Sequence, residues 1–295
     1  MQSSWLGVVL AVAATLSSVA FVADKIELKE KSGSSQDLKL YGDLPGLPPN
    51  SVRFVTYDDL SHLPQVTFQV SDDFNFHGTT EISGIYLDEL LRVLRIPGKG
   101  TMIAAVCDDD YEAHYTDDYL RAHRPILVLR LNGKPPAQYT RTRDDGTYGP
   151  YLVSHASFTP RYHILAHAEE PQIPNGVIGL RFLKEDLVLD AIRPPGKFAA
   201  DSPEMQGYRI AQQNCFRCHN AGEYGGRKSG RSWRSLAHIA QVDPAGFAAY
   251  IKDPQGQDPA AAMPGNPEYD DATLHLLTAY FRTFAPPPEL KQAPK

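Results

Sequence analysis

The sequence predicts two domains, the first mixed α+β and rich in β-strands, the second all-α. The chain has 295 residues, more than one domain usually needs. Short apolar runs rich in β-branched residues recur through residues 51–190, as is typical of strands. After a Pro- and Gly-containing linker over residues 191–201, residues 202–285 carry apolar side chains at helical spacing.

Residues 1–20 have the features of a secretory signal peptide. They contain an apolar run and end in Ser-Val-Ala, a small-x-small cleavage site. No Lys or Arg precedes the apolar run, and residues 5–23 carry no charge, so an uncleaved membrane anchor is the alternative. Both interpretations predict an exported, periplasmic protein. Residues 21–50 are expected to form a linker, and residues 286–295 a tail.

The elements of the first domain follow from apolar patterning. Six runs are expected as strands, at residues 52–55, 65–70, 101–106, 125–131, 151–154 and 176–182. One helix is expected over residues 86–94, because its leucines recur at helical spacing and fall on one face.

The second domain is expected to contain three main helices. The first begins with Ser202 as N-cap and Pro203 at the first helical position, and runs to Cys215. The middle helix is expected over residues 243–254. The last is expected over residues 270–284, where leucine and aromatic side chains share one face.

The first of these helices leads into Cys215-Phe216-Arg217-Cys218-His219, a Cys-x-x-Cys-His run typical of c-type haem attachment in exported proteins. Two thiols three positions apart can each form a thioether to one edge of the same porphyrin. The imidazole that follows can then reach the iron. We therefore expect one covalent haem c, attached through Cys215 and Cys218, with His219 as an axial ligand.

The second axial ligand is expected to be Met263, because Met/His ligation is usual in electron-transfer cytochromes c. His238 is the competing ligand and would give a bis-His haem of lower potential. The cysteine pair has three other interpretations: a zinc site, a dithiol redox pair and a structural disulfide. A zinc site would need a second ligand pair at similar spacing, and the sequence has only one further cysteine, Cys107.

Residues 202–285 resemble class I c-type cytochromes. The resemblance rests on Gly207, eight positions before the first haem cysteine, on the Tyr-Ile-x-Asp-Pro ending of the middle helix, and on the Met-Pro-Gly run that begins at Met263. It implies that Gly207 lets the first and last helices cross closely. No proline lies between His219 and the middle helix, so a carbonyl other than the family's proline carbonyl must orient the His219 ring.

Residues 51–190 resemble the sulfite-oxidase-type molybdopterin-binding fold. The motifs that carry this resemblance, in order, are at residues 84–91 (Gly-x-x-Leu-x-x-Leu-Leu), 109–111 (Asp-x-Tyr), 129–135 (containing Asn-Gly-x-Pro) and 148–153 (containing Gly-Pro-x-Leu-Val). The resemblance implies a molybdenum-binding Cys ahead of the helix, but residues 71–81 contain none, and Tyr151 stands in place of the family's Arg. We expect a relative without metal or molybdopterin, in which Cys107 is a small buried hydrophobic residue.

Several other side chains have competing interpretations. His155, His163 and His167 could suggest a metal site, but their surroundings are expected to be loop and strand, so unliganded histidines are favoured. Trp233 is interpreted equally as a cover for a haem edge or propionate and as a core residue.

The function expected from these patterns is electron transfer through one His/Met haem, with no catalytic residue and with an electron-transfer protein favoured over a catalyst. The expected partner is a dehydrogenase, a reductase or another cytochrome docked on the first domain. The net charge of −6 argues against nucleic acid. A basic cluster could steer an acidic partner or pair with haem propionates; it comprises Arg227, Lys228, Arg231 and Arg234. The alternatives are a molybdopterin-dependent, sulfite-dehydrogenase-like enzyme with a haem c domain, and a haem-based sensor with an open iron site.

Overall fold

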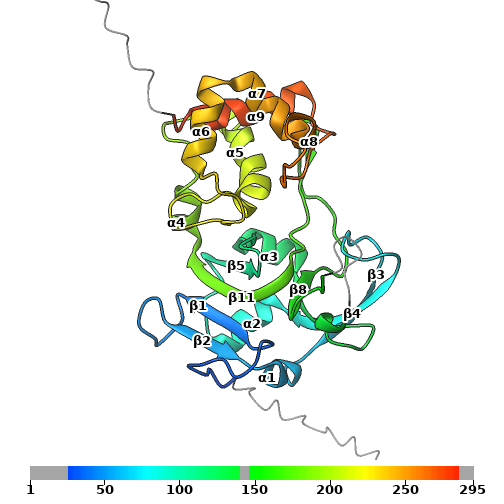
Figure 1. Ribbon diagram of the computed structural model, residues 1–295. Coiled ribbons are helices and arrows are strands. Elements are labelled where there is room, and N and C mark those ends of the chain that lie inside the picture. Colours follow the sequence, from blue (N-terminus) through cyan, green and yellow to red (C-terminus); the bar gives the residue numbers. More distant parts are fainter. Residues whose placement is uncertain (1–25, 140–145, 286–295) are drawn as a thin grey trace, which may run out of the picture.

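The computed structural model describes residues 26–139 and 146–285. A mixed sheet with short helices occupies the lower part of Figure 1, and a group of helices lies above it. We call residues 26–190 the sheet region and residues 203–285 the helical region.

The expected signal segment, residues 1–20, and the expected tail, residues 286–295, lie outside the described residues. Within the described ranges, no helix is long and apolar enough to cross a membrane.

Nine strands of the sheet region form one sheet within the described residues. Its main order is β2-β1-β11-β8-β7-β4-β3, and β5 pairs with β11 and with β6. All described pairings are antiparallel except that of β1 with β11. The strands are β1 (Leu38–Gly42), β2 (Val52–Val55), β3 (Val66–Val70), β4 (Thr80–Tyr86), β5 (Thr101–Cys107), β6 (Glu112–Tyr115), β7 (Ile126–Leu131), β8 (Tyr151–Ser154) and β11 (Asn175–Lys184).

All six strands expected from the sequence are present, within two residues at each end. Strands β1, β4 and β6 were not expected. Strand β1 lies inside residues 21–50, the expected linker, where the alternating Leu38 and Leu40 are buried in the core of the sheet. This short stretch joins the sheet because its two leucines face the same apolar layer.

The helices expected at residues 86–94, 202–215, 243–254 and 270–284 are present, within two residues at each end, whereas α6 (Trp233–Val242) was not expected. The leucine-rich helix α2 begins at Leu87, one residue after the expected start, and buries Leu87, Leu90 and Leu91. Helix α5 begins after Ser202, whose side chain accepts a hydrogen bond from the Met205 backbone N–H at 3.3 Å. The α-helices are α1 (Tyr57–Ser61), α2 (Leu87–Leu94), α3 (Asp117–His123), α4 (Glu185–Asp190), α5 (Pro203–Asn214), α6 (Trp233–Val242), α7 (Pro244–Lys252), α8 (Pro254–Gln257) and α9 (Asp271–Arg282), and the 3₁₀ turns are η1 (Pro136–Gln138) and η2 (Cys215–Arg217).

The two regions share an apolar core. Met102 and Ala104 of β5 belong to the same buried cluster as the apolar side chains of α5 and α9. Ile192, in the expected linker, is fully buried in this cluster, and its carbonyl accepts a hydrogen bond from the Tyr280 hydroxyl. The helices are therefore packed directly onto the sheet.

Helices α5 and α9 cross at very short distance at Gly207. A Cβ atom built on Gly207 would lie 2.1 Å from the Leu276 carbonyl oxygen and 2.7 Å from the Tyr280 Cβ atom. Only a residue without a side chain fits this crossing. The close approach inferred from the class I resemblance is therefore present.

Replacing Gly207 by Ala should lower the free energy of unfolding by about 1–3 kcal/mol, because α9 must move away from α5. The higher helix propensity of Ala offsets part of this loss, by about 1 kcal/mol. Gly230→Ala is the control, since a Cβ atom there would meet nothing within 4 Å. Urea unfolding of both variants makes the comparison, and equal stability of the two would contradict the crossing.

Candidate functional site

A cavity of about 1080 Å³ lies between the helical region and the sheet region. Pockets for small ligands and cofactors commonly measure about 300–1,000 Å³, so this one can take a large group. Its lining includes all four residues expected to hold a haem, namely Cys215, Cys218, His219 and Met263. The structure therefore brings together the two cysteines and both expected axial ligands.

The two cysteines are positioned by the turn that ends α5. The chain continues as η2, and the backbone N–H groups of Cys218 and His219 both donate to the Cys215 carbonyl, at 3.2 and 2.9 Å. This tight turn keeps Cys215, Cys218 and His219 on one wall of the cavity. Both thiols are free, and burial raises the pKa of each, that of Cys215 to about 12.

His219 is almost buried, with 7% of its surface exposed. Its Nδ1 atom donates to the Arg231 carbonyl oxygen at 2.6 Å, so this carbonyl orients the His219 ring. Burial lowers the pKa of His219, which favours the neutral imidazole. With Nδ1 engaged, Nε2 is the nitrogen left to bind a metal.

Met263 lies in a loop that is fixed from α8. The Gln255 side-chain amide donates to the carbonyl oxygens of Ala261 and Met263, at 2.9 and 2.8 Å. Met263 is half-buried and lines the cavity, whereas the competing ligand His238 is exposed on α6 and is not part of the lining. Of the two competing residues, Met263 is the one that lines the cavity together with His219.

Trp233 belongs to the core. It is 3% exposed, its indole N–H donates to the Tyr280 hydroxyl at 3.1 Å, and its ring packs 4.9 Å from that of Phe281. It is not among the residues that line the cavity. Of the two interpretations left open by the sequence, core packing is the one found.

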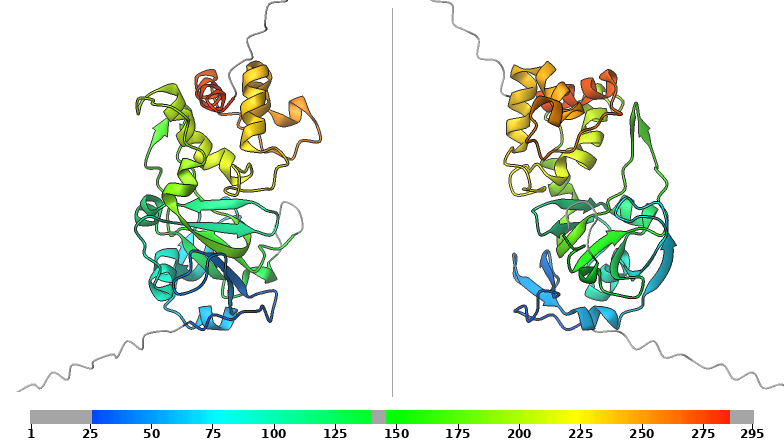
Figure 2. Two further views of the ribbon diagram at one scale, coloured as in Figure 1. Left: turned by 90° about the vertical axis from the view of Figure 1, so that its left-hand side faces the viewer. Right: turned by 45° about the vertical axis from the view of Figure 1, so that its right-hand side comes forward.

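The sheet region supplies a second wall of the cavity through a long connection between β8 and β11. We call residues 155–174 the arm; it contains the hairpin of β9 (His163–Ile164) and β10 (His167–Ala168). The arm rises beside the helices in both views of Figure 2. Its part that lines the cavity comprises Phe158, Pro160, Ala166, His167, Ala168, Glu169, Glu170, Pro171 and Ile173.

Hydrogen bonds hold the arm to the helical region. The Ala166 backbone N–H donates to the Thr273 hydroxyl at 3.1 Å, and His167 Nδ1 is hydrogen-bonded to the Tyr269 hydroxyl at 2.9 Å. Ile164 is buried in the core that the two regions share. The cavity is therefore enclosed jointly by both regions.

The turn between β5 and β6 contacts the loop that follows the Cys-x-x-Cys-His motif. The Arg227 backbone N–H donates to the Asp110 carbonyl at 2.8 Å, and the Lys228 ammonium group pairs with the Asp109 carboxylate. Tyr111, in the same turn, lines the cavity. Two members of the basic cluster thus bind the sheet region, whereas Arg234 is exposed.

The three histidines considered as metal ligands are not brought together as a site. His163 is exposed, His167 contacts Tyr269, and buried His155 is hydrogen-bonded through Nε2 to the Tyr119 hydroxyl at 3.0 Å. Within the described ranges, no group of three His, Cys, Asp or Glu side chains could hold a metal ion. Cys107 is 2% exposed and belongs to the core of the sheet, as expected, and burial raises its pKa well above the usual range.

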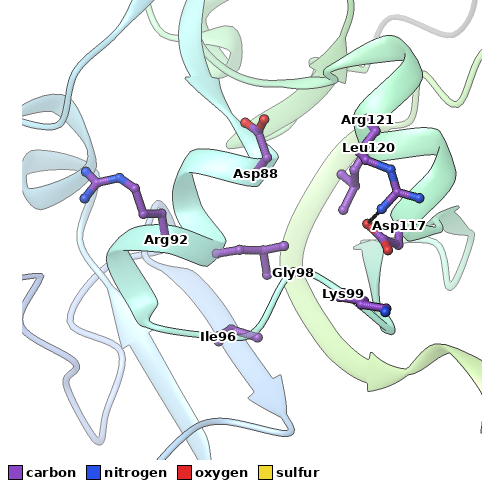
Figure 3. A pocket seen from close by; sticks show the side chains of 9 residues that line it. Asp88, Arg92, Ile96, Gly98, Lys99, Asp117, Leu120 and Arg121 are labelled. Carbon is purple, nitrogen blue, oxygen red and sulfur yellow. Dashed lines mark ion pairs between the residues drawn. The ribbon is translucent and has the colours of Figure 1, made fainter.

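A second hollow, of about 540 Å³, lies on the sheet region between α2 and α3 (Figure 3). It contains none of the expected site residues. Several of its charged groups are paired locally, Arg121 with Asp117 and Arg124 with Asp88 at the rim. We assign no role to it.

Comparison with known proteins gives only distant likenesses among solved structures. No family model and no curated protein matches this sequence. Among solved structures, the sulfane dehydrogenase SoxCD from Paracoccus pantotrophus is similar with a TM-score of 0.32 and 15% identity, over 52% of this chain and 40% of that chain. The likeness therefore extends over less than half of the SoxCD chain, and it is too distant to assign a function.

The buried histidine His155 should make stability depend on pH. Burial, followed by the nearby His123, lowers its pKa to about 3. Between about pH 6.5 and pH 3 the unfolded chain therefore takes up a proton that the folded chain does not, so stability is lost as the pH falls through this window. The slope from this one group is at most about 1.4 kcal/mol per pH unit.

Replacing His155 by Gln should flatten the loss of unfolding free energy between pH 6.5 and pH 4, measured by urea unfolding of the full chain. His163→Gln, at an exposed position of the arm, is the control and should keep the wild-type slope. A wild-type slope in the His155 variant would show that His155 is protonated in the folded state.

Proposed function

We propose that this chain is an electron-transfer protein with one covalent haem c, bound through Cys215 and Cys218, and with His219 and Met263 as axial ligands. The observation that carries the proposal is that these four side chains line one cavity while the Arg231 carbonyl engages His219 Nδ1. That hydrogen bond fixes the tautomer and the ring orientation that metal ligation requires.

The chemistry that a bound haem supplies is a reversible one-electron change between ferrous and ferric iron, so no substrate bond needs to be made or broken. The chain's own residues hold the site in place. The Arg231 carbonyl orients His219, and Gln255 fixes the loop of Met263. A thioether ligand favours ferrous iron and raises the reduction potential.

We further propose that residues 202–285 form an all-α domain of the class I cytochrome c kind. Its support is the close crossing of α5 and α9 at Gly207 and the place of Met263 between α8 and α9. Residues 51–190 then form a sulfite-oxidase-like domain without molybdopterin. Residues 71–81 contain no cysteine, and Cys107 is buried in the core, so neither offers a thiolate to a metal.

The partner is a redox protein, and the chain is exported to the periplasm, where covalent haem attachment follows secretion. Phe74 of the sheet region, 80% exposed, and Asp72 both line the cavity. A dehydrogenase, reductase or cytochrome docked on the sheet region would meet the cavity at these residues. This location supports docking on the first domain.

The purified full chain should contain one covalently attached haem and no stoichiometric molybdenum. Replacing Cys215 and Cys218 by Ala should abolish haem that resists acid–acetone extraction, because the thioether bonds cannot form. Cys107→Ala, outside the cavity, should retain it. Elemental analysis and haem staining provide the measurements, and about one molybdenum per chain would instead favour the sulfite-dehydrogenase-like enzyme.

Replacing Met263 by His should remove the weak absorption band that a thioether on ferric iron gives near the red end of the spectrum. The midpoint potential should fall, since imidazole is the stronger donor and favours the ferric state. His238→Ala should leave both unchanged, because this side chain points to solvent on α6. The reverse pattern would indicate bis-His ligation, and no effect from either variant would favour an open, sensor-type iron site.

A further inference from the structure

Arg217 lies between the two haem cysteines, and its side chain is only 14% exposed. Its Nη1 atom is 3.4 Å from Glu170 Oε2, whereas Nε and Nη2 are buried and have no hydrogen-bond partner among the described residues. A guanidinium stays protonated in proteins. Arg217 therefore carries a positive charge that is only partly compensated, at the wall of the cavity.

Glu170 comes from the other region of the molecule, on the arm. It is anchored to the helical region, because the Asn214 side-chain amide donates to Glu170 Oε1 at 3.1 Å and the Glu170 backbone N–H donates to Gln213 Oε1 at 3.2 Å. Glu170 also lines the cavity. The ion pair thus joins the haem-binding motif to the sheet region at the cavity wall.

Burying an incompletely paired cation lowers the stability of the fold. Such a group is therefore a candidate for a role in the site. Ferric haem carries one positive charge more than ferrous haem. A fixed positive charge beside it therefore favours the reduced state, and a fixed negative charge favours the oxidised state. At an effective dielectric constant of about 20, two unit charges roughly 10 Å apart interact strongly enough to change an equilibrium constant about tenfold.

We propose that the sheet region sets the reduction potential of the haem, by placing Glu170 of the arm against Arg217 of the haem-binding motif. Arg217 raises the potential, and Glu170 moderates that effect. The sheet region thereby has a function of its own, as the wall of the cavity that carries the counter-charge. This inference rests on the proposed function, since it presumes a haem in the cavity.

The test is a double-mutant cycle on the haem-loaded full chain, with midpoint potentials measured by spectroelectrochemistry. At a fixed applied potential, Arg217→Gln should lower the ratio of reduced to oxidised haem about tenfold. This change corresponds to a fall in the midpoint potential of about 59 mV. Glu170→Gln should shift the ratio in the opposite direction. The double variant should lie between the single variants, close to the wild type.

Arg234→Gln is the matched control, because it removes a positive charge from an exposed position outside the cavity lining. Arg217→Lys keeps the charge and should retain most of the wild-type potential. If the Arg217 variants do not hold haem, the proposal is tested by Glu170→Gln alone. The midpoint potential of this variant must then be higher than that of Arg234→Gln.

Two results would overturn the proposal, provided that the spectrum shows an intact His/Met haem. One is a shift of the midpoint potential in the same direction in both single variants. The other is a shift no larger than that of Arg234→Gln. A wild-type protein without covalent haem would contradict the proposed function instead. The two failures are therefore distinguishable before any variant is made.

Discussion

The ring of Phe216 connects the two regions from within the Cys-x-x-Cys-His motif, and the site depends on its packing. Phe216 is fully buried, stacks on His114 of β6 at 4.6 Å between ring centroids, and meets Trp233 of α6 edge-on at 5.5 Å. Gly225 leaves room for it, since a Cβ atom there would come within 2.5 Å of the Phe216 ring. Because Phe216 lies between the two cysteines, the same contact that docks the helices on the sheet also orients the turn that carries Cys215 and Cys218.

This packing makes the cavity a property of the whole molecule. The helical region contributes Cys215, Cys218, His219 and Met263, and the sheet region contributes the arm and the turn at Tyr111. The apolar core also crosses the boundary, through Met102 and Ala104 of β5. Motion of the helices away from the sheet would therefore expose apolar surface and open the cavity to water, and both changes are unfavourable.

Electrostatics at the cavity follow from the same arrangement. The arm carries Glu170 to Arg217, and the β5–β6 turn carries Asp109 to Lys228. Two cationic side chains of the helical region thus have their counter-charges on the sheet region. The Arg217–Glu170 pair is partly buried and is therefore screened less than a pair in water, whereas the Lys228–Asp109 pair is exposed.

The sequence by itself determined the local parts of the site. The spacing of Cys215, Cys218 and His219 is set by chemistry within five residues, and the N-cap at Ser202 and the leucine spacing of α2 are equally local. The expected strands were found because alternating apolar residues and β-branched residues favour strands over helices. Strand β1 was missed because it is short, lies in a polar stretch and pairs with β11, which is far away in the sequence.

Only the tertiary structure decided what encloses the site. Glu170 and Arg217 are 47 positions apart, and His167 and Tyr269 are 102 apart. No periodicity or motif links such pairs, because their contact depends on how the arm folds over the helices. Tertiary structure also decided that Trp233 belongs to the core and that Arg231 orients His219. Local spacing can specify which side chains could ligate a haem, whereas the cavity wall, the counter-charge at Glu170 and the carbonyl that orients His219 arise only when separate segments pack together.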